Sequence, residues 1–443
     1  MVIPGPVIDS ALGAVLGIVA AALAFFLLRR SAKLAIGLWL AVVSLLPVWV
    51  GVSFGFGGNF YLPLASIVAV IVILALLPVR RFAFHLIDAL VGLLWIVGVA
   101  ALFTGNTGIA LSFLFTLVAY FSVGYILGRS APARLDLRWL YGAVGVMFTV
   151  VAILAIIEFA TRWNLFVQLS VNNSAYIAWG QLQERGGVLR AEGAFGHSIA
   201  LGSSLAIAVP LTLASRFRFP IRGVMVLVML LATVLTFSRI GMIGALLGLV
   251  LSVLFLREAF PERGRIALAT AVTVASLGLF PIVATVFTDA GTEASGSAAY
   301  RGDLLSLLGD MNLIGLSDSA RRTADGQVYF GNFRSIDSQL ILTGLSSGTL
   351  VLAVALIALA AAVILVLRRR ASAATIAVVA QIPALATVAL ITQYAILVWF
   401  VIGLAVASQV AIGGHATIPA HDGRQEFLLR DRPSNLRESA KKP

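Results

Sequence analysis

Long apolar runs are the feature of this chain that most constrains its fold. Runs of about 17 to 25 residues, the length an α-helix needs to cross a hydrocarbon core about 30 Å thick, recur from near the amino terminus to about Gly413. Hydrophobic residues make up 60% of the 443 residues and charged residues only 11%, whereas an ordinary soluble domain carries about 25% charged residues. The sequence therefore predicts an all-α integral membrane protein.

Apolar windows predict twelve or thirteen transmembrane helices. The predicted spans are residues 11–28, 34–52, 62–77, 84–103, 109–127, 139–160, 198–214, 221–237, 240–256, 266–287, 340–367, 376–392 and 395–412. We expect one membrane domain, residues 1–414, followed by a charged tail, 415–443, whose composition predicts disorder on the cytoplasmic side.

The basic residues divide unequally between the two sides of these spans. With the amino terminus outside, 23 of the 31 Lys and Arg residues fall on the inner face and eight on the outer face. Such a bias is what the positive-inside rule requires, so we expect a multi-pass membrane protein with its amino terminus outside. The net charge of +12 then reflects topology and attraction to membrane lipids, and it does not support a nucleic-acid partner.

The predicted spans carry almost no charge, which moves the expected chemistry to the outer surface. Asp88 and Glu158 lie near the ends of their spans, where a structural role suits them, with the side chain either snorkelling to the interface or paired. Two outer loops, residues 161–197 and 288–339, are long enough to be functional. Cysteine is absent and the four histidines are scattered, so we expect neither a metal site nor a cofactor.

All eight outer basic residues are arginines, and a planar guanidinium fork matches phosphate oxygens bidentately. They are Arg162, Arg185, Arg190, Arg239, Arg301, Arg321, Arg322 and Arg334. For Arg162, Arg185, Arg321 and Arg322, a solvated or paired loop role is an equally good interpretation. Arg239 differs because it lies in a hairpin of a few residues between two apolar spans. The pattern favours an anionic partner such as a diphosphate.

Several motifs together resemble the O-antigen ligase and polymerase superfamily. The first is Thr236-Phe-Ser-Arg239, followed by Ile-Gly and an apolar helix. Upstream, Arg190-Ala-Glu-Gly-Ala-Phe-Gly-His197 leads into another helix, and downstream come Arg301-Gly-Asp and Ser-Ile-Asp337-Ser. The resemblance covers about residues 139–366, and it is specific as an ordered set rather than motif by motif.

The resemblance implies a multi-helix fold related to the GT-C glycosyltransferases, with a large outer loop between late helices. Members of this superfamily transfer glycans from polyprenyl diphosphate carriers on the outer face of the cytoplasmic membrane. Arg190, Arg239 and Arg301 match the family arginines, which would hold the lipid diphosphate of the donor and stabilise charge on the leaving group. A hydroxyl of the glycan acceptor would attack the anomeric carbon with inversion, without a metal, after a general base takes its proton.

The general base is where the sequence departs from the ligases. Ligases that load lipid A carry a histidine near the end of the large loop, whereas residues 288–339 contain no histidine and end in Asp337-Ser338. This favours a polymerase of lipid-linked oligosaccharide units, or another transferase of the superfamily, with Asp337 as the candidate base. His197 is the alternative base, although its place after Gly196 also suits a helix start, and Glu192 could position either group or pair with Arg190.

Other functions remain open on the sequence alone. A ligase would differ from a polymerase only in its acceptor. A non-enzymatic flippase or transporter would use the arginines to line a path, but such a path normally carries charge deeper in the membrane than this chain does.

Overall fold

The computed structural model describes residues 10–55, 59–77, 84–103, 107–256, 262–267, 300, 302–323 and 328–416, together with 270, 273, 274 and 277. The helices, written α, are α1 (Ser10–Leu28), α2 (Ala32–Leu45), α3 (Leu64–Leu76), α4 (Leu86–Ala100), α5 (Thr107–Thr116), α6 (Val123–Ser130), α7 (Leu137–Thr161), α8 (Ser174–Trp179), α9 (Ser198–Leu213), α10 (Phe219–Leu235), α11 (Arg239–Phe255), α14 (Gln339–Ser347), α15 (Thr349–Leu367), α16 (Ala373–Ala380), α17 (Ile382–Thr387) and α18 (Thr392–Ala416).

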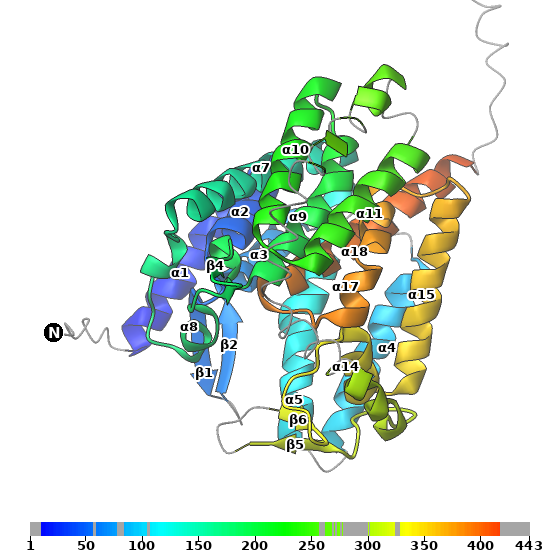
Figure 1. Cartoon of the computed structure of the whole chain (residues 1–443). Coiled ribbons are helices and arrows are strands. Elements are labelled where there is room, and N and C mark those ends of the chain that lie inside the picture. Colours follow the sequence, from blue (N-terminus) through cyan, green and yellow to red (C-terminus); the bar gives the residue numbers. More distant parts are fainter. Residues whose placement is uncertain are drawn as a thin grey trace, which may run out of the picture.

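Three antiparallel hairpins accompany the helices. They are β1 (Gly51–Gly55) with β2 (Asn59–Pro63), β3 (Glu184–Arg185) with β4 (Val188–Leu189), and β5 (Ala320–Arg322) with β6 (Val328–Phe330). In Figure 1, β5 and β6 lie at the lower edge of the molecule, and α14 lies above them. The predicted loop 288–339 is thus partly folded, and it also contains a 3₁₀ helix, Leu304–Asp310.

Five helical segments in the described part of the chain are long and apolar enough to cross a membrane. They are Leu86–Phe103, Thr107–Ala133, Leu137–Thr161, Thr349–Leu367 and Thr392–Val410, and seven shorter apolar helices accompany them. The predicted all-α membrane class therefore agrees with the structure, although twelve or thirteen full spans remain a prediction. The predicted span 266–287 and the predicted tail lie almost entirely outside the described residues.

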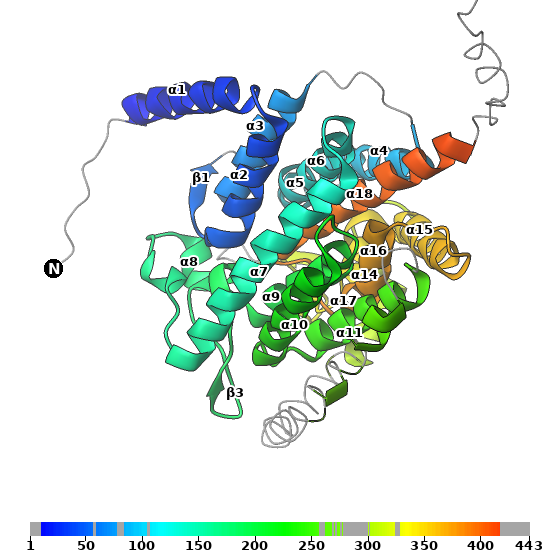
Figure 2. The ribbon, with the colours of Figure 1, turned by 90° about the horizontal axis from the view of Figure 1, so that it is seen from above.

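Helix α9 lies at the centre of the fold. Fifteen of its sixteen residues are buried, and it packs against α7, α10, α11, α16 and α18 (Figure 2). Small residues permit this close packing: a Cβ on Gly241 of α11 would lie 2.9 Å from the Gly202 backbone of α9. Because α9 and α11 meet near their amino-terminal ends, the motifs that precede these two helices are brought together.

Helices α6 and α18 form a second close pair. A Cβ on Gly128 would fall on the carbonyl oxygen of Phe400, and one on Gly124 would lie 2.5 Å from the Ile396 carbonyl. Backbone contacts of this kind are typical of membrane helices, where small residues let neighbouring chains approach.

Two predicted spans were wrong in their continuity. Residues 340–367 form two helices, α14 and α15, because Gly348 between them has φ +97°, which breaks the helix. Residues 376–392 likewise divide at Gln381 into the short helices α16 and α17. Pro383 follows directly at the start of α17, where its missing N–H is tolerated.

The predicted paired role of Asp88 is confirmed. Its carboxylate accepts hydrogen bonds from Arg129 Nε and Nη2, both at 3.1 Å, and from the Tyr125 hydroxyl at 2.5 Å. The side chains of Asp88 and Arg129 are each only 7% exposed. This ion pair joins the first turn of α4 to the last turn of α6.

Candidate functional site

Two arginines converge on the turn between α10 and α11. Arg190 Nε donates to the Thr236 carbonyl at 2.9 Å, and Arg185 Nη1 donates to the Phe237 carbonyl at 3.0 Å. These carbonyls belong to consecutive residues, so both guanidinium groups are held at one turn. The hairpin β3–β4 delivers both arginines, and the Ala191 amide also donates to the Leu235 carbonyl at 3.2 Å.

The turn that receives these arginines is strained. Phe237 has φ +46° and is only 1% exposed, a conformation that is costly for a bulky residue and is often found at functional sites. Ser238 then caps α11 by accepting a hydrogen bond from the Gly241 amide at 3.1 Å. Arg239 follows as the first residue of α11, with an exposed side chain. The structure thus brings Arg185, Arg190 and Arg239 to one turn.

Two buried glutamates, Glu158 and Glu192, lie near Arg190. Glu158 of α7 accepts hydrogen bonds from the Asn164 side chain at 2.8 Å and from the amides of Glu192 and Gly193 at 3.1 and 2.8 Å. These contacts hold the loop before α9 against α7, so the expected structural role of Glu158 agrees with its contacts.

Glu192 is held by fewer donors. It is 1% exposed, and its Oε1 accepts from the Gln183 amide at 3.0 Å, while its Oε2 has no hydrogen-bond partner among the described residues. Burial raises the pKa of Glu192 to about 8; nearby Glu158 adds to this, and the Gln183 amide and Arg190 oppose it. At neutral pH the side chain is therefore mostly a neutral carboxylic acid.

His197 begins helix α9. Its Nδ1 accepts a hydrogen bond from the Ile199 amide at 3.1 Å, and its ring packs edge-on against Trp179. Burial lowers the pKa of His197 to about 4, and the charge of Arg190 adds to this effect. The ring is neutral, and because Nδ1 accepts, its proton is on Nε2. In this conformation His197 acts as a helix cap, and it would have to release that cap to take a proton through Nδ1.

Asp337 lies in a different part of the chain, directly before α14. It is half-buried and accepts a hydrogen bond from the Ser335 hydroxyl at 2.9 Å. Tyr300 donates to the Ser335 carbonyl, and burial, followed by the charge of Asp337, raises the pKa of that tyrosine. Arg301, the third predicted diphosphate ligand, lies outside the described residues.

The segment between α17 and α18 connects these two regions. On one side, the side-chain oxygen of Gln339 accepts a hydrogen bond from the Leu390 backbone amide at 2.9 Å. The backbone amide of Gln339 donates to the Val388 carbonyl at 3.1 Å. On the other side, Gln393 Nε2 donates to the Ala194 carbonyl at 2.9 Å. The six residues Val388–Gln393, the last two of which begin α18, therefore tie the residues after Asp337 to the residues after Glu192.

From the sequence, a phosphate ligand and a solvated loop arginine were equally good interpretations of Arg185, and Gln183 was not named at all. The structure places both at the arginine turn: besides supporting Glu192, Gln183 accepts from Arg190 Nη1 at 3.3 Å and from the Ser198 hydroxyl at 3.2 Å. The available signal was the short spacing from Arg185 to Arg190, since a tight Gly186-Gly187 turn folds the first arginine back beside the second.

Within the part of the chain that the structure describes, no three His, Asp or Glu side chains are grouped so that they could hold a metal ion. Comparisons of the chain with protein-family models, curated proteins and solved structures found no match.

Proposed function

We propose that this protein is a glycosyltransferase of the cytoplasmic membrane that extends lipid-linked oligosaccharides at the outer face, using a polyprenyl diphosphate-linked donor. The observation that carries the proposal is the convergence of Arg185 and Arg190 on consecutive carbonyls of the turn that leads into Arg239. Like charges held this close repel one another, and a bound dianion offsets that repulsion. The ordered motifs of the sequence and the bias of its basic residues support the same assignment.

In this proposal the arginines stabilise the leaving diphosphate. The acceptor hydroxyl attacks the anomeric carbon, and its proton passes to Asp337 as the new C–O bond forms. The bond from that carbon to the diphosphate oxygen breaks with inversion, and the electron pair leaves with the lipid diphosphate. Charge that grows on the leaving oxygens is met by fixed guanidinium groups, which is the usual largest source of rate enhancement. The α17–α18 segment would keep base and arginines in register.

The test uses the purified protein in detergent with a synthetic polyprenyl diphosphate oligosaccharide, and products are resolved by length. Lengthened lipid-linked chains support a polymerase. Transfer to an added foreign glycan acceptor, without lengthening, would instead make the protein a ligase. If neither product forms, while vesicles containing the protein move the labelled lipid between leaflets, the proposal is wrong and a flippase is right.

Variants separate the diphosphate ligands from other arginines. Arg190→Ala and Arg239→Ala should abolish extension, and Arg301→Ala should do the same. Arg334→Ala, which removes an exposed arginine from the other loop, is the matched control and should retain activity. Arg190→Lys keeps the charge but loses the planar fork, so an intermediate rate is expected. Unchanged product lengths in all three alanine variants would contradict the role of the arginines.

A further inference from the structure

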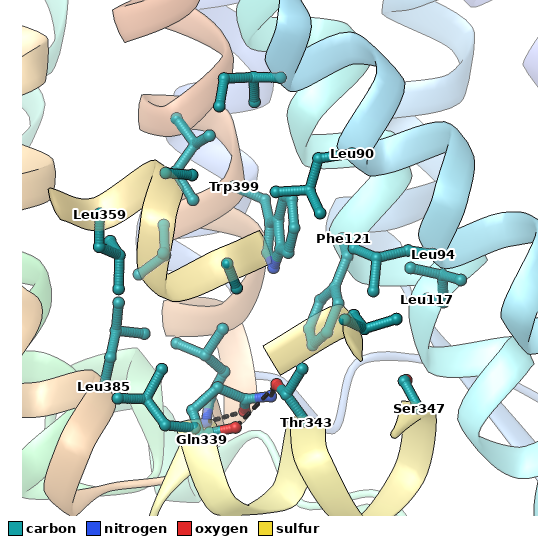
Figure 3. A pocket seen from close by; sticks show the side chains of 18 of the residues that line it. Leu90, Leu94, Leu117, Phe121, Gln339, Thr343, Ser347, Leu359, Leu385 and Trp399 are labelled. Atoms are coloured by element: carbon teal, nitrogen blue, oxygen red, sulfur yellow. Dashed lines mark hydrogen bonds between the residues drawn. The ribbon is translucent and has the colours of Figure 1, made fainter. Parts of the chain in front are cut away.

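A cavity of about 360 Å³ is lined mainly by residues of α4, α5, α14, α15, α16 and α18, and none of the arginines named above lines it. This volume is within the range of small-molecule pockets, about 300–1,000 Å³. Figure 3 shows Leu90, Leu94, Phe121 and Trp399 projecting into it, with Gln339 and Thr343 at one end. The cavity is not part of the arginine turn.

The cavity is long and almost entirely apolar. Its lining on α15 runs from Val351 to Leu365, which corresponds to about 20 Å along a helix at 1.5 Å per residue. None of its lining residues is Arg, Lys, Asp or Glu. His85, which caps the start of α4, also lines the cavity. A ligand with a charged group would find no counter-charge along this wall.

The largest group of polar lining residues lies at the α14 end of the cavity, while Thr116, Thr375 and Gln409 line it elsewhere. Gln339, Thr343, Ser346 and Ser347 all line it there, and Gln339 Nε2 donates to the Thr343 hydroxyl at 3.3 Å. Hydroxyl and amide groups at the end of an apolar channel match a molecule with a hydrocarbon tail and an uncharged, hydrogen-bonding head.

Trp399 adds a donor partway along the channel. Its indole Nε1 is buried and has no hydrogen-bond partner among the described residues, and its ring stacks on Phe121 with centroids 5.1 Å apart. Phe121 belongs to a π-helical turn, Leu117–Ser122, a feature often found at functional sites. An ester carbonyl would satisfy this indole, whereas an isoprenoid chain has no oxygen to offer.

Helices α4 and α15 separate the cavity from the surroundings of the protein. Their outward faces expose large apolar side chains, including Ile96 at 68% and Ile357 at 66%. Such faces suit lipid contact, so the cavity is one helix away from hydrocarbon and its occupant would enter laterally.

We propose that this cavity binds an acylglycerol lipid with an uncharged, hydroxyl-bearing head, its acyl chain along α15 and its head at Gln339, Thr343, Ser346 and Ser347. The site is distinct from the proposed diphosphate site, and it does not depend on the transferase activity. The bound lipid would fill the space between α4–α5 and α15–α18 and satisfy the Trp399 indole.

The test measures quenching of tryptophan fluorescence in phosphatidylcholine vesicles that contain a few mole per cent of diacylglycerol brominated on its acyl chains. We expect a saturable quenching phase in the wild-type protein that is absent in Trp399→Phe. Trp163→Phe, which removes an exposed loop tryptophan, is the matched control and should retain the phase. Thr343→Val should raise the half-saturating diacylglycerol fraction about two- to tenfold, as expected for one lost hydrogen bond.

Three results would overturn the proposal: the same saturable phase in Trp399→Phe, equal saturation by brominated phosphatidylglycerol, whose head is charged, or displacement of the brominated lipid by a polyprenyl diphosphate. The last result would assign the cavity to the tail of the proposed donor. The tryptophan fluorescence of Arg190→Ala should be quenched by brominated diacylglycerol as in the wild type. Loss of transferase activity and loss of lipid binding are therefore separable.

Discussion

Replacing Glu192 with glutamine should stabilise the protein at neutral pH and flatten its stability profile. A carboxyl whose pKa is raised in the folded state contributes stability that is present below its unfolded pKa and lost as the pH rises through its folded pKa. For Glu192 that window runs from the ordinary value of 4.5 to about 8. Glutamine resembles the protonated acid and can keep the hydrogen bond from the Gln183 amide, but it does not titrate.

The size of the effect follows from the same values. At pH 7 the folded protein keeps Glu192 protonated, whereas in the unfolded chain this carboxyl has a pKa of 4.5 and has lost its proton. Because pH 7 lies about 2.5 units above that pKa, folding is less favourable by about 3 kcal/mol, at 1.36 kcal/mol per unit. Glu192→Gln should recover much of that cost at pH 7 and nearly none at pH 4.5. The sign is therefore the reverse of that for a salt-bridged carboxylate, whose contribution is lost at low pH.

The assay is thermal unfolding in detergent, followed by tryptophan fluorescence from pH 4.5 to 8.5. The difference in unfolding temperature between variant and wild type should widen steadily with pH. Glu184→Gln is the matched control, because Glu184 lies eight residues away in the same loop but is exposed. Parallel curves for Glu192→Gln and the wild type would refute the assignment of a neutral, buried Glu192.

Three further outcomes are expected. Gly128→Ala should destabilise the protein by about 1–3 kcal/mol in thermal unfolding because its methyl group meets the Phe400 carbonyl. The control is Gly92→Ala, in open space on α4, which should be neutral or slightly stabilising. Equal effects of the two variants would contradict the α6–α18 packing. His197→Ala should cost about 1 kcal/mol through loss of the helix cap, and His197→Asn should restore it; loss of chain extension in His197→Asn at normal stability would instead make His197 the base. Asp337→Asn should abolish extension without changing the unfolding temperature, and full activity would remove Asp337 as the base.

Much of the fold could be predicted from apolar length alone. Long runs such as Leu137–Thr161 appear as helices within a few residues of the predicted ends, because bilayer thickness imposes both a composition and a length. The errors lie where the backbone changes direction inside an apolar run. Gly348 is the clear case, because hydropathy does not reveal a glycine with positive φ. The sequence Ser346-Ser347-Gly348 did offer a local signal of a break.

The candidate site could be predicted only in part, for a different reason. Arg190 and Arg239 carry a residue type that suits phosphate, so they are recognisable in the sequence. The turn where the arginines meet is not recognisable in the sequence. Arg190 and Arg185 are held by the main-chain carbonyls of Thr236 and Phe237, respectively, and every residue has such a carbonyl. Which carbonyls are used depends on how α9 and α11 pack.

The two glutamates show how the same local packing sets electrostatics that composition cannot reveal. Glu158 and Glu192 are identical in type, and both are buried near one loop. Glu158 receives three donors from Asn164 and the 192–193 amides, whereas Glu192 receives one, from Gln183. A buried carboxyl with few donors is more stable neutral than charged. The loop before α9 therefore places a buried carboxyl that is neutral at pH 7 beside Arg190. In the proposed function, this uneven distribution of N–H donors would favour binding of an anion at the α10–α11 turn at neutral pH.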